Sequence, residues 1–137
     1  MTMAIRKMTM ALGITCALAA TLPPAALAHH SVSMFDTSKS VLVEGTVKDW
    51  NWTNPHSWLQ LMVLSDGKQV EAGYELRSPN ALLREGFAED SFHPGDHVKV
   101  LAAPRRDGSV GGMLLCVRTA DGKWLGSDPS SKDKCHD

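Results

Sequence analysis

The sequence lacks the features that mark several well-defined functional classes. It has no excess of positive charge, since 14 lysines and arginines stand against 15 aspartates and glutamates. Nucleic-acid affinity rests on basic side chains that neutralise phosphates, so this balance excludes a typical nucleic-acid binder. The chain also has no glycine-framed nucleophile, phosphate-binding loop or dinucleotide fingerprint. Ser31 and Ser57 adjoin histidines, but neighbours in a strand point apart. The sequence therefore does not favour an enzyme.

Long apolar runs are missing as well. The longest one, residues 8–22, is short for a membrane span, and no second hydrophobic segment follows it. It follows two basic residues and precedes a small-x-small sequence, Ala26-Leu27-Ala28, which is the pattern of a cleaved secretory signal peptide. We therefore expect a periplasmic protein that starts at His29 and keeps no stable membrane anchor. Cleavage removes two basic and no acidic residues, which leaves the mature chain mildly acidic.

Cysteine is scarce, with three residues in all. Cys16 lies in the signal peptide, so Cys116 and Cys135 remain in the mature chain, and an oxidising compartment permits them to pair. A disulfide between them would contribute about 3 kcal/mol on the chain-entropy model. The alternative is a buried Cys116 and a free Cys135 in a frayed tail.

Alternating apolar residues predict five strands and one short helix. The predicted strands cover residues 41–47, 58–64, 69–76, 97–102 and 113–119. Asp66-Gly67 indicates a hairpin turn between the second and third strands. After the third strand, Ser78 with Pro79 reads as the start of a helix, and Gly86 is available to end it.

This order of elements predicts an all-β fold with one short helix, a five-stranded OB-like barrel in which the helix fills the gap between the third and fourth strands. The alternative is an open five-stranded meander with the helix on one face. We divide the chain into a signal peptide (1–28), an N-terminal lead-in (29–40), the barrel (41–125) and a loose C-terminal tail (126–137), whose polar composition predicts little order.

The stretch from Trp50 to Trp58 is the most unusual part of the chain. It holds three of the four tryptophans, a turn-forming Asn54-Pro55 and a histidine between two alternating runs. Proline lacks an N–H and pushes the preceding residue out of the helical region, so Asn54-Pro55 should end one strand. His56 then opens the next strand at the mouth of the barrel.

Histidines provide the first functional hypothesis, which is metal binding. Cleavage after Ala28 would expose the amine of His29 beside its own ring, with His30 adjacent and His56 available from the barrel. Amine and imidazole nitrogens suit copper(II), and zinc after it. The alternative is that the two terminal histidines are an accident of the cleavage boundary. His93 and His97 flank a turn with Asp96, where a solvated turn is the favoured interpretation.

The aromatic residues provide the second hypothesis, a binding module without a metal. Its candidate residues are Trp50, Trp52, Asn54, Trp58 and Tyr74, which could line a groove for a ligand or a partner. Such tryptophans are more often packed in the core. Glu71 and Glu75 form an acidic pair on the third strand, which usually indicates a solvated face.

Several short motifs recur together in one known family. They are the Ala28-His29-His30-Ser31 junction with Met34-Phe35-Asp36, Glu44-Gly45-Thr46-Val47, Trp52-Thr53-Asn54-Pro55-His56-Ser57-Trp58, Ser78-Pro79-Asn80 with Leu83-Arg84, and Pro94-Gly95-Asp96. In this order the chain resembles, from His29 to about Leu125, a family of small exported bacterial proteins known only as a domain of unknown function. The resemblance implies an exported, mostly β, single domain, and no established activity. It places the terminal histidines and His56 in one shared pattern, and it leaves out the tail with Cys135.

Overall fold

The computed structural model describes residues 32–136, so the predicted signal peptide, His29 and His30 lie outside the described residues. The strands and the helix are, in chain order, β1 (Val41–Asn51), β2 (Trp58–Ser65), β3 (Lys68–Glu75), α1 (Pro79–Leu83), β4 (His97–Pro104), β5 (Gly111–Arg118) and β6 (Trp124–Gly126). Two 3₁₀ helices flank them, η1 (Val32–Met34) and η2 (Pro129–Lys134). Within residues 32–136, no helix has the length and apolar character needed to cross a bilayer.

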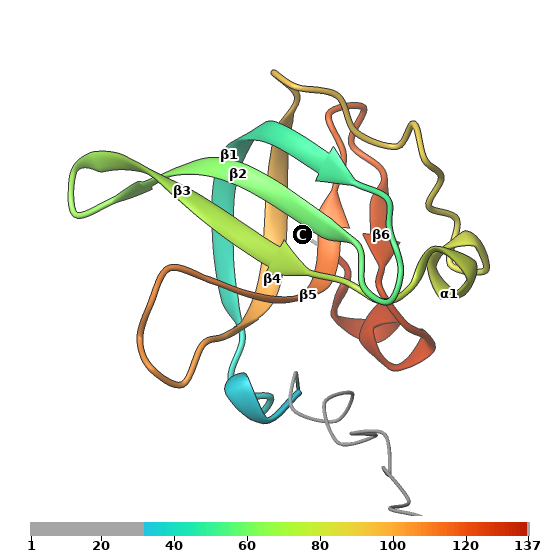
Figure 1. The fold of residues 1–137 in the computed structure, drawn as a ribbon, viewed down its shortest axis with the longest axis horizontal. Helices are drawn as coiled ribbons and strands as arrows, with labels where there is room; N and C mark the ends of the chain where they lie inside the picture. The colour runs from blue at the N-terminus through green and yellow to red at the C-terminus, as the bar shows by residue number, and fades with distance from the viewer. Residues whose placement is uncertain (1–31, 137) are drawn as a thin grey trace, which may run out of the picture.

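Strands β1 to β5 close into a barrel (Figure 1). β1 pairs antiparallel with both β2 and β4, β2 pairs with β3, and β4 pairs with β5. A parallel pairing of β3 with β5 closes the circle. An open meander would pair β3 with β4 and leave β1 and β5 as free edges, so the pairings of β1 with β4 and of β3 with β5 rule the meander out. The predicted OB-like barrel, with its helix between the third and fourth strands, is confirmed.

The alternating pattern of each strand places one set of side chains inside the barrel. The buried interior residues include Leu59, Leu61 and Val63 on β2, Ala72 and Tyr74 on β3, and Val98, Val100 and Ala102 on β4. β5 differs, because Leu114 to Val117 are all buried. β6 and η2 both contact β5, and we attribute the burial of both of its faces to that cover.

β1 is longer than the predicted strand, which ends at Val47. The alternation breaks there because the pairing of β1 with β2 shifts register between Val47 and Asp49. Such a bulge inserts one residue, so the alternation of inward and outward side chains is shifted by one position in the part of the strand beyond it. Trp50, beyond the bulge, therefore packs against the core.

The turns and the helix form where the sequence predicts them. Asp66 and Gly67 both have positive φ, as the two-residue hairpin between β2 and β3 requires. Pro79 is the first residue of α1. After the helix, the amide of Gly86 donates to the carbonyl of Leu83 and that of Phe87 to Leu82, a Schellman closure with Gly86 at positive φ.

The C-terminal segment is folded, unlike the loose tail that its composition predicts. β6 pairs with β5, and the Asp128 carboxylate caps η2 by accepting hydrogen bonds from the amides of Ser130 and Ser131. Cys116 on β5 and Cys135 form a disulfide. Polar composition predicts disorder only when nothing else holds a segment. Here a helix cap and a covalent link supply the order that apolar residues would otherwise provide.

The start of the described chain is anchored as well. Phe35 is fully buried, forms an isolated bridge with Arg105 and lies under the Arg105 guanidinium at 5.7 Å from the ring centre. Because Phe35 fixes this segment, the preceding η1 is held against the body of the barrel.

Candidate functional site

His56 and Glu75 form a contact at one end of the barrel. His56 lies two residues before β2, just after the cis peptide bond Asn54–Pro55, and Glu75 is the last residue of β3. The Nδ1 atom of His56 meets the Oε1 atom of Glu75. The side chain of His56 is 36% exposed and that of Glu75 only 9%. A buried carboxylate therefore holds a histidine that still reaches the surface.

Backbone hydrogen bonds fix the two residues relative to each other. The amide of Ser57 donates to the carbonyl of Arg77, and the amide of Leu76 donates to the carbonyl of Ser57. Trp58 is the register partner of Glu75 across β2 and β3. The pairing of β2 with β3 thus continues past the formal strand ends and carries His56 to Glu75.

The pair lies in the wall of a small cavity of about 100 Å³. Its lining comes from η1, from the barrel and from the residues just before η2, and comprises Val32, His56, Glu75, Leu76, Arg77, Met113, Leu114, Ser127 and Asp128. Val32, which follows His29 by three positions in the sequence, is one of these lining residues.

The predicted metal ligands can be located only in part. His56 lies in the cavity wall, whereas His29 and His30 are outside the described residues. Within residues 32–136 no group of three or more histidine, cysteine or acidic side chains is arranged to hold a metal ion. The described residues therefore offer His56 with its carboxylate partner, and any further ligands have to come from elsewhere.

Glu75 is the site residue whose burial the sequence does not predict. The acidic pair Glu71 and Glu75 indicates a solvated face, and Glu71 is indeed exposed, where it pairs with Lys48. Glu75 is buried at the end of β3, where it is the register partner of Trp58 on β2 and of Met113 on β5. The only signal in the sequence is the position of Glu75, which a hairpin at Asp66-Gly67 places opposite Trp58.

Trp50 and Trp52 are partly buried and pack against the hydrophobic core. The Trp50 ring lies 5.5 Å from Trp52, 5.1 Å from Phe92 and 6.5 Å from Phe87, measured between centroids. Its indole N–H donates to the carbonyl of Ala88 at 3.2 Å. Trp50 therefore ties β1 to the loop that follows α1.

The other predicted rim residues lie in different surroundings. Trp58 is half-buried beside Glu75, and Asn54 is exposed in the turn. Tyr74 is only 1% exposed, and burial raises the pKa of its phenol above the usual 10.0. It lines a different, largely apolar cavity of about 210 Å³, which also includes Val41, Leu64 and Val110.

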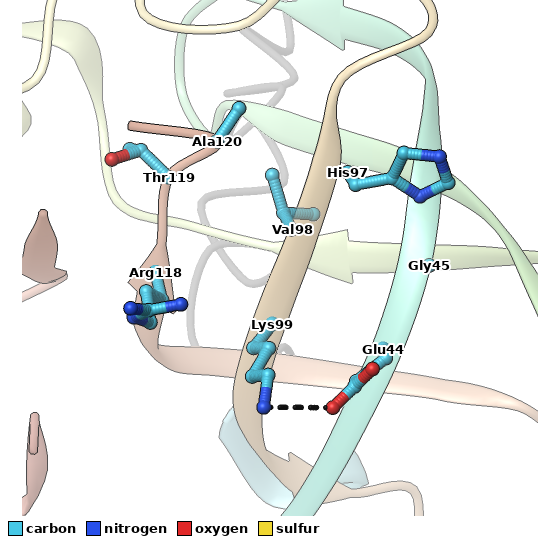
Figure 2. Close-up of a pocket in the computed structure, with 8 residues that line it drawn as sticks. All are labelled: Glu44, Gly45, His97, Val98, Lys99, Arg118, Thr119 and Ala120. Atoms are coloured by element: carbon cyan, nitrogen blue, oxygen red, sulfur yellow. Dashed lines mark ion pairs between the residues drawn. The ribbon is translucent and has the colours of Figure 1, made fainter. Parts of the chain in front are cut away.

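His93 and His97 do not converge. The His93 ring is 70% exposed, with its Nδ1 atom 3.9 Å from Asp96 Oδ2. His97 Nδ1 lies 3.3 Å from the hydroxyl of Thr46. Its ring lines a polar cavity in which Lys99 pairs with Glu44 at 2.9 Å (Figure 2). The predicted solvated turn agrees with the exposure of His93.

Comparison with known proteins gives a family and no activity. No curated protein matches the sequence. Residues 17–115 match the model of the family described as "Family of unknown function (DUF6152)". The matched range contains His29, His30, His56 and Glu75 and ends one residue before Cys116, so the disulfide and η2 lie outside it. The match spans most of the chain, which belongs to the DUF6152 family of unknown function.

Proposed function

We propose that this chain is an exported metal-binding protein that holds copper(II), ahead of zinc, through His29, His30 and His56. The observation that carries the proposal is that Val32 and His56 line the same cavity. Each residue of a chain spans at most about 3.3–3.6 Å. The Cα of His29, three residues before Val32, therefore lies within about 11 Å of the Val32 Cα.

The chemistry of the three residues suits copper. After cleavage at Ala28, the amine and ring of His29 can chelate one ion, and the His30 and His56 rings add further nitrogen donors. Copper(II) has the highest affinity of the divalent first-row metals for such nitrogen ligands. His56 is a suitable third contributor because its ring is partly exposed at the cavity while its Nδ1 is already engaged.

The disulfide supports the exported location. Disulfides persist in oxidising compartments and are rare in the cytosol, and Cys116 and Cys135 are bonded. The basic start, apolar run and small-residue cleavage sequence of residues 1–28 agree with export to the periplasm. Only cleavage at Ala28 creates the free amine of His29, so the proposed site and the proposed location depend on each other.

The alternative function, a ligand- or partner-binding rim of tryptophans, has less support. Trp50 is engaged by Phe87, Phe92 and the Ala88 carbonyl. Tyr74 is buried and faces a separate cavity. No observation favours this second function over the first.

The test is a copper(II) titration against a competing chelator, using mature protein that begins at an authentic His29. Loss of a residue that only hydrogen-bonds to a metal ligand typically lowers metal affinity about 10- to 100-fold. Loss of the ligand itself should cost no less, so we expect His56→Ala to weaken copper binding at least about tenfold. His93→Ala is the matched control, because it removes an exposed histidine outside the cavity. Equal affinity in the wild type and His56→Ala would reduce the site to a terminal chelate and refute the proposal.

A further inference from the structure

The apolar cavity of about 210 Å³ opens between the β2–β3 hairpin and the loop that joins β4 to β5. Both segments extend from the same side of the barrel, and Ser65 of the hairpin and Val110 of the loop line the cavity together (Figure 1). Among the described residues, this cavity shares no lining residue with the one that contains His56. It is therefore a separate candidate site.

The inner wall of the cavity is part of the barrel core. Val63, Tyr74 and Ala102 line it, and each side chain is at most 2% exposed. Other lining residues are apolar and exposed, with 46% for Val41, 68% for Leu64 and 43% for Val110. Single exposed apolar residues need no explanation, but several of them around one concave, apolar opening are typical of a binding site.

The lining determines the charge and size of a fitting ligand. The lining side chains include no lysine, arginine, histidine, aspartate or glutamate within the described part of the chain. A charged group would lose its hydration there without gaining a partner, so the enclosed part of the ligand must be uncharged. An apolar cavity of about 150 Å³ holds benzene. The cavity described here therefore has room for one ring with a small substituent.

Tyr74 supplies a polar group at the inner wall. Burial raises the pKa of its phenol, and no hydrogen bond contributes to this rise. Another hydroxyl in the lining, that of Ser109, already donates to the Asp107 carboxylate at 2.7 Å. Buried tyrosine hydroxyls usually have a hydrogen-bond partner. A ligand that carries an acceptor would provide one for Tyr74.

We propose that this cavity binds an uncharged molecule of about one substituted ring, whose apolar part fills the cavity and whose acceptor takes a hydrogen bond from the Tyr74 phenol. The walls are held in place by barrel closure, because Tyr74 and Gly112 are register partners where β3 meets β5. Gly111 has positive φ, and a Cβ there would lie 2.5 Å from the Gly73 carbonyl oxygen. This close approach fixes the start of β5 beside the cavity. The site is independent of the proposed metal site.

The experiment titrates mature protein, which contains the whole barrel, with three probes of similar size. Acetophenone is uncharged and has an acceptor, cumene replaces the ketone with an apolar group, and benzoate carries a charge. Methyl resonances of Leu64 and Val110 report binding, because both side chains line the cavity. We expect saturable shifts with acetophenone and cumene. Benzoate should bind at least about tenfold more weakly than acetophenone, because the cavity offers its charge no partner.

Two neighbouring residues of β1 provide a matched pair of variants. Val41 lines the cavity, whereas Leu42 does not, and the two are similarly exposed, at 46% and 56%. Val41→Trp places an indole at the opening, so we expect it to abolish saturable binding of acetophenone and cumene. Leu42→Trp should keep the wild-type affinities. Thermal unfolding establishes that each variant is folded.

Tyr74→Phe tests the hydrogen bond, because it removes the hydroxyl and keeps the ring. A neutral hydrogen bond contributes enough to make acetophenone bind about 2- to 10-fold more weakly to this variant. The affinity for cumene should not change. If Tyr74→Phe does not fold, nuclear Overhauser effects between acetophenone and the Tyr74 ring in the wild type decide instead, and their absence refutes the contact.

Each opposite result overturns the proposal. Without saturable shifts from either uncharged probe, there is no binding site. Equal affinities in Val41→Trp and Leu42→Trp would mean only adventitious contact with exposed apolar side chains. Benzoate that binds as tightly as acetophenone would refute the uncharged class of ligand, and acetophenone that binds equally to Tyr74→Phe and the wild type would refute the role of Tyr74.

Discussion

Lys132 of η2 reaches Glu85, two residues beyond α1, with 2.8 Å between Nζ and Oε2. The carboxylate is almost completely buried, whereas the lysine side chain is more than half exposed. The η2 helix is therefore held by this ion pair to the segment after α1 and by the disulfide to β5.

The ion pair predicts the effect of Lys132→Ala. The change leaves the buried Glu85 carboxylate without this cation, and an uncompensated buried polar group costs about 1–3 kcal/mol. We expect urea denaturation to show a loss in the free energy of unfolding within that range. Lys134→Ala, in the same helix, is the control. An unchanged midpoint in Lys132→Ala would mean that water or another cation replaces the lysine.

The disulfide predicts a larger effect. The bond between Cys116 and Cys135 closes a loop with a sequence separation of 19, for which the chain-entropy model gives about 3 kcal/mol. We expect the double variant Cys116→Ala/Cys135→Ala to lose about that much in the free energy of unfolding. Reduction of the wild type should give a similar loss, while the double variant should be insensitive to reductant. A double variant as stable as the wild type would contradict the role assigned to this bond.

Tyr74 predicts a loss of stability in alkali. Burial raises its pKa above 10.0 in the folded state. A raised folded pKa means that the contribution of Tyr74 is complete below the unfolded pKa of about 10 and is lost as the pH rises through the folded pKa. Because the chain has one tyrosine, tyrosinate absorbance follows this residue alone. We expect its midpoint above 10 in the native protein and near 10 in denaturant; a native midpoint at or below 10 would refute the burial.

A substitution of Trp50 distinguishes a role of this residue in packing from a role in ligand binding. Trp50→Ala removes a ring that contacts Phe87 and Phe92 and a hydrogen bond to the Ala88 carbonyl. Large-to-small changes of this kind cost about 3–5 kcal/mol when the ring is fully buried, so this partly buried ring should cost somewhat less. We expect reduced thermal stability and, in the folded variant, unchanged copper affinity. A Trp50→Ala variant that keeps its stability but no longer binds a non-metal ligand would instead support the hypothesis of a tryptophan-lined binding rim.

The sequence predicts the barrel well because its signals are local. Alternation around Leu59 and Leu61, the Asp66-Gly67 turn and the Ser78-Pro79 helix start each depend on a few neighbouring residues. The β-bulge after Val47 is harder to predict, because it depends on how β1 pairs with β2.

The site is predictable only in part. His56 stands out beside Asn54-Pro55, but Glu75 is buried where β3 pairs with β5, and its partner there, Met113, is far away in the chain. Likewise, the order of the C-terminal segment comes from a disulfide and from the ion pair of Lys132 with Glu85, which composition does not encode. Contacts between distant segments, rather than local patterns, determine the part of the site that the sequence analysis misplaces.

The central claim is that His56 of the barrel shares one metal ion with the mature N-terminus. The most direct measurement is a crystal structure of protein beginning at His29, grown with copper(II), with anomalous diffraction recorded at the copper absorption edge. We expect one anomalous peak in the cavity that Val32 and Glu75 line. It should mark a copper ion bonded to His56 Nε2 and to nitrogens of His29 and His30. A copper ion held by the terminal residues alone, with His56 unbound, would contradict the claim.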